Sequence, residues 1–301
     1  MNINHSLITK TKAFLLITLF IVDVVIVSAC IIGMFSSCNN SDEEAETDAT
    51  EQTPETLTIH ATVQKWEDST TTELQDSATR ASYSSVSENS GNKAFSMTFQ
   101  SGDNIGLFAV DEDGRVVIAN QKYTYSGSSW TTENPTEYSA SLRTCTFFAY
   151  YPWKETLTGA PELDNRPDIT SADSFFQTAL DEWYPANDQS TQALFSAQDL
   201  MIAKGTSSIP YFHEVKVTFT MTHQMGLLVT KTSLPYYDED DPTDTWNVEQ
   251  EFTTNIPYIN GGYCYYFAKP NVSTTLGTKT TTVQARQIEQ LYFTNGEPTK
   301  N

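Results

Sequence analysis

Alternating apolar and polar residues predict β-strands along much of this chain, and the first of these segments is among the clearest. In residues 57–66 the apolar side chains of Leu57, Ile59, Ala61 and Val63 occupy every second position, with polar residues between them. Successive side chains of a strand point to opposite faces. The segment is therefore expected to bury one face against a core and expose the other.

The same alternation returns from Val215 to Met221, where Val217 and Phe219 share the apolar face. Shorter or more continuous apolar runs, bounded by Gly, Pro, Asn and Asp, predict further strands. These are expected at 95–99, 105–110, 115–119, 122–126, 145–151, 194–203, 225–230 and 258–268. Residues 283–293 fit a strand or a helix. Many short strands separated by turns indicate an all-β sandwich or barrel.

Changes in composition suggest how the chain is divided. Residues 38–56 are acidic, rich in Thr and poor in apolar side chains, as expected of a disordered tether. The turn-forming stretch 205–210 indicates a domain boundary. We therefore expect an N-terminal β-sandwich domain at 57–208 and a C-terminal β-sandwich domain at 209–301.

Residues 1–37 have the pattern of an export signal. Lys10 and Lys12 precede an apolar run at 13–22, which resumes after Asp23. This is the order of a positive region and a hydrophobic region in a signal peptide. The length would also permit a membrane-spanning anchor, because a span needs about 20 apolar residues.

Two cysteines near the end of this segment match the pattern of a bacterial lipoprotein cleavage site, in which small residues precede the lipidated Cys. Cys30 follows Val-Ser-Ala and Cys38 follows Phe-Ser-Ser. We favour Cys38, because a protein that began at Cys30 would expose Ile31 and Ile32. Polar and acidic residues follow Cys38 directly. Cys30 is the alternative lipidation site.

The charge of the chain excludes one class of partner. Lys and Arg number 17 against 38 Asp and Glu, for a formal net charge of -21. Such a chain repels phosphate backbones, so nucleic acid is not an expected partner. Aromatic residues reach 12%, which suits the pleated, half-buried surfaces of β-sheets.

Beyond the export signal the chain contains two cysteines, Cys145 and Cys264, both in aromatic, strand-like runs. A disulfide between them is compatible with an oxidising compartment. Two buried free thiols that act as small apolar side chains are the alternative.

No pattern of residues predicts a metal, cofactor or catalytic site. His213 and His223 share a face of one predicted strand, but ten residues separate them, or roughly 33 Å of strand. Each is expected to be an interior histidine. The acidic stretch 238–241 lacks the glycine and distal glutamate of a calcium loop and is expected to be an exposed loop. Residues 111–114 are expected to form a hairpin turn.

Aromatic residues offer another candidate chemistry, the stacking of sugar rings. The run at 263–267 and the side chains of Trp130, Trp153 and Trp246 are the candidates. Such residues more often fill a sandwich core or pair across strands.

Several stretches, in their order and spacing, resemble the fimbrillin family, the type V pilins and related surface lipoproteins of Bacteroidetes. They are FQSGDNIGLF at 99–108, FFAYYPW at 147–153, DQS at 188–190, SAQDLMIA at 196–203 and VTFTMTHQMGLLV at 217–229. The acidic residues after Cys38 look like the surface-export signals of such lipoproteins. The resemblance extends from about residue 57 to residue 268.

The resemblance implies two tandem transthyretin-like β-sandwich domains and a non-enzymatic structural or accessory fimbrial subunit that mediates adhesion. In this family an N-terminal strand is cut off after an Arg, and a strand of the next subunit fills the groove. Here the strand would be 57–66 and the Arg would be Arg80, in a polar stretch of the kind that proteases cut. An uncleaved Arg80 is the alternative.

The expected location is the outer membrane and cell surface, in a fimbrium. The implied partners are other fimbrial subunits by strand exchange, the outer membrane through the lipid, and surface glycans or proteins. Shaft, anchor and tip roles all remain open. A glycan-binding surface lipoprotein of a nutrient-uptake system is the alternative function.

Overall fold

The computed structural model describes residues 56–66, 82–83, 97–133, 135, 142–211, 214–237 and 245–291. The chain divides into two compact units, Met1–Gln52 and Thr53–Asn301. All the described residues belong to the second unit. Cys30, Cys38, Arg80, His213 and the acidic stretch 238–241 lie outside the described residues.

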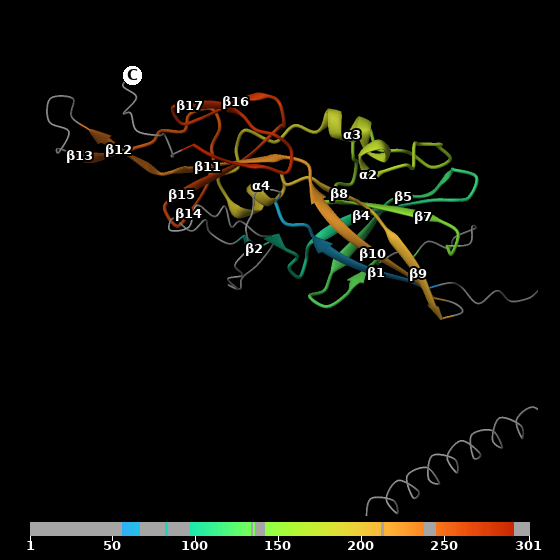
Figure 1. Ribbon diagram of the computed structural model, residues 1–301. Helices are drawn as coiled ribbons and strands as arrows, with labels where there is room; N and C mark the ends of the chain where they lie inside the picture. Colours follow the sequence, from blue (N-terminus) through green and yellow to red (C-terminus); the bar gives the residue numbers. More distant parts are fainter. Residues whose placement is uncertain are drawn as a thin grey trace, which may run out of the picture. The chain divides into compact units, whose positions relative to one another are not determined.

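Eight strands form the first sheet, in the order β1-β10-β8-β7-β4-β5-β6, with β9 as a further partner of β10 (Figure 1). They are β1 (Thr56–Val63), β4 (Asn104–Val110), β5 (Val116–Tyr125), β6 (Trp130–Thr131), β7 (Thr146–Tyr151), β8 (Met201–Lys204), β9 (Thr206–Tyr211) and β10 (Glu214–His223). Strand β1 runs parallel to β10, and the other pairs of this sheet are antiparallel. Because β1 also lies near β6, at the opposite end of the order, the sheet nearly closes on itself.

The second sheet has four strands in the order β14-β15-β11-β18. They are β11 (Gly226–Lys231), β14 (Tyr258–Asn260), β15 (Tyr263–Ala268) and β18 (Ile288–Gln290). Three two-stranded pairs accompany the sheets: β2 (Ser82–Tyr83) with β3 (Met97–Thr98), β12 (Ser233–Tyr237) with β13 (Thr245–Glu249), and β16 (Ser273–Leu276) with β17 (Lys279–Thr282). The described helices are short: α2 (Ala172–Phe175), α3 (Gln177–Glu182) and α4 (Gln192–Ser196).

Strands β4 and β7 are buried on both faces and supply two cores. Leu107 and Phe147 belong to the core enclosed by the first sheet, which we call the sheet core. Their neighbours Phe108 and Phe148 belong to a second core, shared with the helices and the second sheet, which we call the junction core. The continuous apolar runs of these strands are explained by this double burial.

The expectation of a mostly β fold is confirmed, with local differences, two of which concern β5 and α4. The strands expected at 115–119 and 122–126 form one strand, β5, in which Asn120 adopts a left-handed conformation with φ 51° and interrupts the alternation. The strand expected at 194–203 begins instead with helix α4, whose N-terminus is capped by the Thr191 hydroxyl as it accepts from the Leu194 amide.

The sheet boundaries bear on the domain division. Residues 206–211, which include most of the expected boundary, form β9 and pair with β10. Strand β10 pairs in turn with β1 and β8 in the first sheet. The chain passes from the first sheet to the second between His223 and Gly226.

Candidate functional site

Strand β1 lies at the edge of the first sheet, and β10 is its ladder partner there (Figure 1). The parallel ladder runs from Thr56 opposite Glu214 to Val63 opposite Met221. The strand predicted from the alternation is thus confirmed over Thr56–Val63.

The inward faces of the two strands are apolar along the whole ladder. On β1, Ile59 is buried and its inward neighbours are half-buried. Their register partners on β10 are completely buried. The pairs are Leu57 with Val215, Ile59 with Val217, Ala61 with Phe219 and Val63 with Met221. We call this row of β10 side chains the β1 groove, because loss of β1 would expose it.

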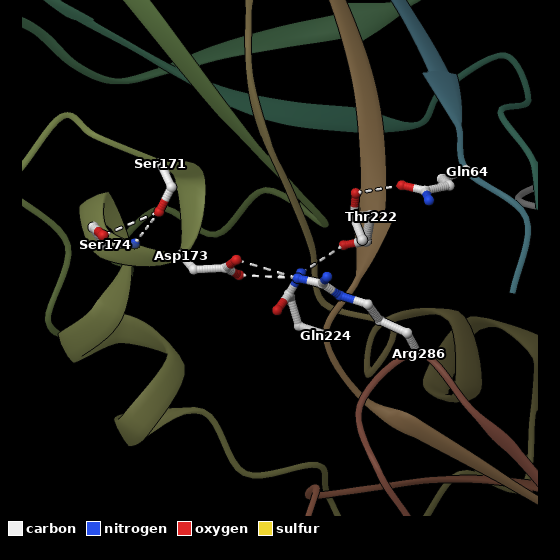
Figure 2. Close-up of polar contacts among 7 residues, drawn as sticks. All are labelled: Gln64, Ser171, Asp173, Ser174, Thr222, Gln224 and Arg286. Atoms are coloured by element: carbon white, nitrogen blue, oxygen red, sulfur yellow. Dashed lines mark hydrogen bonds and ion pairs between the residues drawn. The ribbon is translucent and has the colours of Figure 1, made fainter. Parts of the chain in front are cut away.

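Side-chain polar contacts between β1 and β10 lie on the exposed face. The Thr58 hydroxyl donates to the Glu214 carboxylate at 3.0 Å. After the last ladder pair, the Gln64 amide donates to the Met221 carbonyl at 2.7 Å. The Thr222 hydroxyl donates to the Gln64 side-chain oxygen at 2.9 Å, as Figure 2 shows. Such solvent-accessible hydrogen bonds contribute modestly to stability, so β1 is held in the groove mainly by its main-chain ladder and by apolar contact.

Trp66 ends this segment and packs in the junction core instead of the sheet core. Its side chain is 2% exposed. The indole ring stacks on the His223 ring, with centroids 4.0 Å apart and planes 18° apart. The Phe267 ring lies 6.1 Å from it at a similar tilt. The sequence pattern does not predict the burial of Trp66, because this residue is out of phase with the alternation that identifies β1.

His223 is an interior histidine, as expected. Its side chain is 2% exposed, and its Nδ1 atom lies 2.7 Å from Oδ1 of the fully buried Asp199. The carboxylate fixes the orientation of the imidazole ring and with it the surface on which Trp66 stacks.

Polar side chains join the elements around this junction. Arg286, in the turn before β18, lies 3.1 Å from the Asp173 carboxylate of α2. In Figure 2 this pair lies next to Thr222 and Gln224, and the Gln224 side-chain amide donates to the Thr222 main-chain carbonyl. Directly after β15, the Lys269 ammonium donates to three main-chain carbonyls at the end of α3.

Cys145 and Cys264 are buried free thiols, so the disulfide alternative is not realised. Burial, and secondarily the charge of Glu249, raises the pKa of Cys264 to about 12. A thiol with so high a pKa is unreactive at neutral pH, which is typical of a structural cysteine.

The aromatic candidates for sugar stacking are largely core residues. Trp130 is 6% exposed and packs against Phe99 and Tyr125. Trp153 is half-buried, and its indole N–H donates to the Asn120 carbonyl. Residues 263–267 lie in the buried strand β15. The side chain of Trp246 lies outside the described residues.

The acidic turn at 111–114 forms as expected between β4 and β5. The Asp111 carboxylate accepts from the main chain and side chain of Arg115. The Arg115 amide lowers the pKa of Asp111, and the positive charge of Arg115 lowers it further. Within the described part of the chain, no group of three metal-ligating side chains occurs. No helix there is long and apolar enough to cross a bilayer.

Comparison with known proteins points to fimbriae. A family model described as "Fimbrillin-like" matches residues 79–256. The protein named "Putative fimbrium tip subunit Fim1C" of Bacteroides ovatus is 37% identical over 139 residues, which are 46% of this chain and 24% of that protein. The chain therefore matches about a quarter of this relative's length.

A solved structure shares the fold. The crystal structure of a fimbrial protein from Bacteroides ovatus superposes with a TM-score of 0.51 at 23% identity, over 79% of this chain and 48% of that one. A second, a cell adhesion protein of the same species, superposes with a TM-score of 0.38 at 13% identity over 76% of this chain and 88% of that one. The first supports a common fold.

Proposed function

The chain belongs to the fimbrillin-like family, whose members are structural fimbrial proteins and not enzymes, and on this premise we propose that it joins neighbouring fimbrial subunits by strand exchange. The observation that carries the proposal is the position of β1. It is a parallel edge strand whose four inward side chains cover completely buried residues of β10. An edge strand can leave without breaking a second ladder.

The physical step is the replacement of β1 by a strand of another subunit. A cut after Arg80 would leave β1 attached to the remainder of the protein through non-covalent contacts alone. Its departure would expose the β1 groove and the unpaired main-chain groups of β10. A strand from a neighbouring subunit, with apolar side chains at alternate positions, would cover the groove and form hydrogen bonds with these main-chain groups. The family match begins at residue 79, directly beside Arg80 and after β1.

The setting we propose is the cell surface. Lipidation at Cys38, or at Cys30, would tether the precursor to the outer membrane. A tip position is favoured over a shaft or anchor position, because the 37% identical relative is named as a tip subunit. Adhesion to surface glycans or proteins would follow from that position.

The two sheets fit tandem transthyretin-like domains if the boundary is placed where the chain leaves β10. The first domain would then contain β1 to β10 and the second β11 to β18. This division keeps the β1–β10 ladder within one domain, so strand exchange would act on the first domain.

The test is cleavage and assembly of the purified chain. An arginine-specific protease should produce a new N-terminus at Ala81, identified by mass spectrometry, followed by multimers that resist SDS. The matched variant Arg80→Ala should keep its N-terminal segment and stay monomeric. If the wild-type chain is cut after Arg80 and remains strictly monomeric with β1 retained, the proposal is wrong.

A further inference from the structure

Trp66 differs from the rest of the β1 segment in where its side chain is buried. The inward residues of β1 contact the sheet core. Trp66 lies in the junction core, beside residues of the second sheet. The segment that strand exchange would remove therefore fills two separate sites, an apolar groove and an aromatic pocket.

The walls of the aromatic pocket are held in place by residues outside the 56–66 segment. The His223 ring is fixed by Asp199 at 2.7 Å. Phe267 is fixed through its main chain, because the buried Gln189 side chain accepts from its amide and donates to its carbonyl, both at 2.9 Å. Phe195 stacks on Phe267, with the ring centroids 4.5 Å apart. We expect these walls to keep their arrangement when Trp66 leaves, since none of these contacts involves it.

An empty pocket of this kind would be unfavourable. It would leave a cavity the size of a Trp side chain and would expose the faces of the His223 and Phe267 rings. Filling such a cavity with a planar aromatic group recovers both the lost burial and the ring stacking. A small side chain would recover neither.

We propose that this pocket recognises an aromatic side chain of the incoming strand, and that Trp66 occupies it until exchange takes place. The inference rests on the strand exchange proposed above. The occupant is a strand of a neighbouring subunit that runs parallel to β10. It carries apolar side chains at the positions of Leu57, Ile59, Ala61 and Val63, and an aromatic side chain three residues after the last of them.

The parallel direction follows from the placement of the pocket. His223 is the last residue of β10, and β1 runs towards it, so that Trp66 reaches it after the ladder ends. An antiparallel strand would need its aromatic residue before its first inward residue. The pocket therefore selects both the direction of the incoming strand and its final side chain.

The experiment uses the complete chain with a recognition sequence for a site-specific protease inserted after Arg80. Once cut, the protein is offered fluorescein-labelled peptides with the sequence of residues 56–66. One peptide is native, one carries Trp66→Ala, one Trp66→Phe, and a control carries His60→Ala on the exposed face. Uptake is measured by fluorescence anisotropy, after gel filtration has shown that the label travels with the protein.

The native peptide should bind at least roughly 100-fold more tightly than the Trp66→Ala peptide, which is the lower end of the loss expected for truncation of a buried Trp side chain. The Trp66→Phe peptide should recover most of the affinity, and the His60→Ala peptide should match the native one. Equal binding of the native and Trp66→Ala peptides would overturn the aromatic pocket and leave strand exchange standing. If none of the peptides enters the cut protein, strand exchange and the inference that rests on it both fail.

Discussion

The two sheets each end in a parallel edge strand, but β1 and β18 are held in different ways. Strand β1 pairs with β10 over eight positions. Strand β18 pairs with β11 over three, from Leu227 opposite Ile288 to Val229 opposite Gln290. Main-chain hydrogen bonds extend β18 on both sides, from the Arg286 amide to the Met225 carbonyl and from the Leu291 amide to the Val229 carbonyl.

The residues that lead into β18 are also packed tightly. Val283 is 3% exposed, and a Cβ atom on Gly226 would lie 2.2 Å from its Cγ1 atom. Strand β18 is thus fixed by contacts that depend on its particular neighbours. Strand β1 itself, from Thr56 to Val63, is held by apolar side chains at alternate positions, a pattern that another strand can reproduce. Ladder length is therefore a poor guide to which edge strand can be exchanged.

The sharpest way to test this comparison is to truncate one buried isoleucine in each edge strand. Ile59 is 5% exposed and Ile288 is 1% exposed. The change Ile288→Ala should lower the free energy of unfolding by about 2–4 kcal/mol, because the cavity lies in the junction core. The change Ile59→Ala should lower the free energy of global unfolding by about half as much, since β1 can detach locally while the remainder stays folded.

Urea unfolding gives the global values, and hydrogen exchange of the β10 amides reports local detachment. Exchange at β10 should accelerate in Ile59→Ala and not in Ile288→Ala under conditions where both proteins are folded. His60→Ala, on the exposed face of β1, is the matched control and should change neither measurement. A larger global loss for Ile59→Ala than for Ile288→Ala would contradict the comparison.

The sequence predicts those parts of the fold in which a periodic pattern of apolar residues persists. The alternation at 57–63 identified the inward face of β1, and that at 215–221 did so for β10. Neither pattern could show that two segments so distant in the chain pair in parallel. The burial of Trp66 could not be predicted, because the chain leaves the ladder after Gln64, where the two-residue period ends. Helix α4 was missed because five residues are too few for a helical period to emerge.

Alkaline pH should weaken the second sheet through Cys264 on β15. Its folded pKa is raised from 9.0 to about 12 by burial. The folded protein therefore keeps the thiol protonated while the unfolded chain loses the proton. The contribution to stability is complete below pH 9 and is lost progressively as the pH rises towards about 12.

The measurement is urea unfolding at a series of pH values from 8 to 11, with Cys264→Ala as the variant. The free energy of unfolding of the variant should fall less steeply with rising pH than that of the wild type. At pH 8 the variant should be the less stable of the two, because it lacks the volume of the buried thiol. Tyr150, in β7 of the first sheet, has a pKa raised by burial to about 12 and contributes a slope of the same sign in both proteins. Identical slopes for variant and wild type would rule out a contribution from Cys264.

The smallest expected effect concerns the ion pair between Arg286 and Asp173, which links the turn before β18 to α2. The two side chains are 32% and 52% exposed, so solvent screens their attraction. The change Asp173→Asn should lower the free energy of unfolding by less than about 1 kcal/mol. Added salt should reduce the difference further. A loss above about 2 kcal/mol would mean that this pair, and not the main-chain hydrogen bonds and packing around β18, fixes the second edge strand.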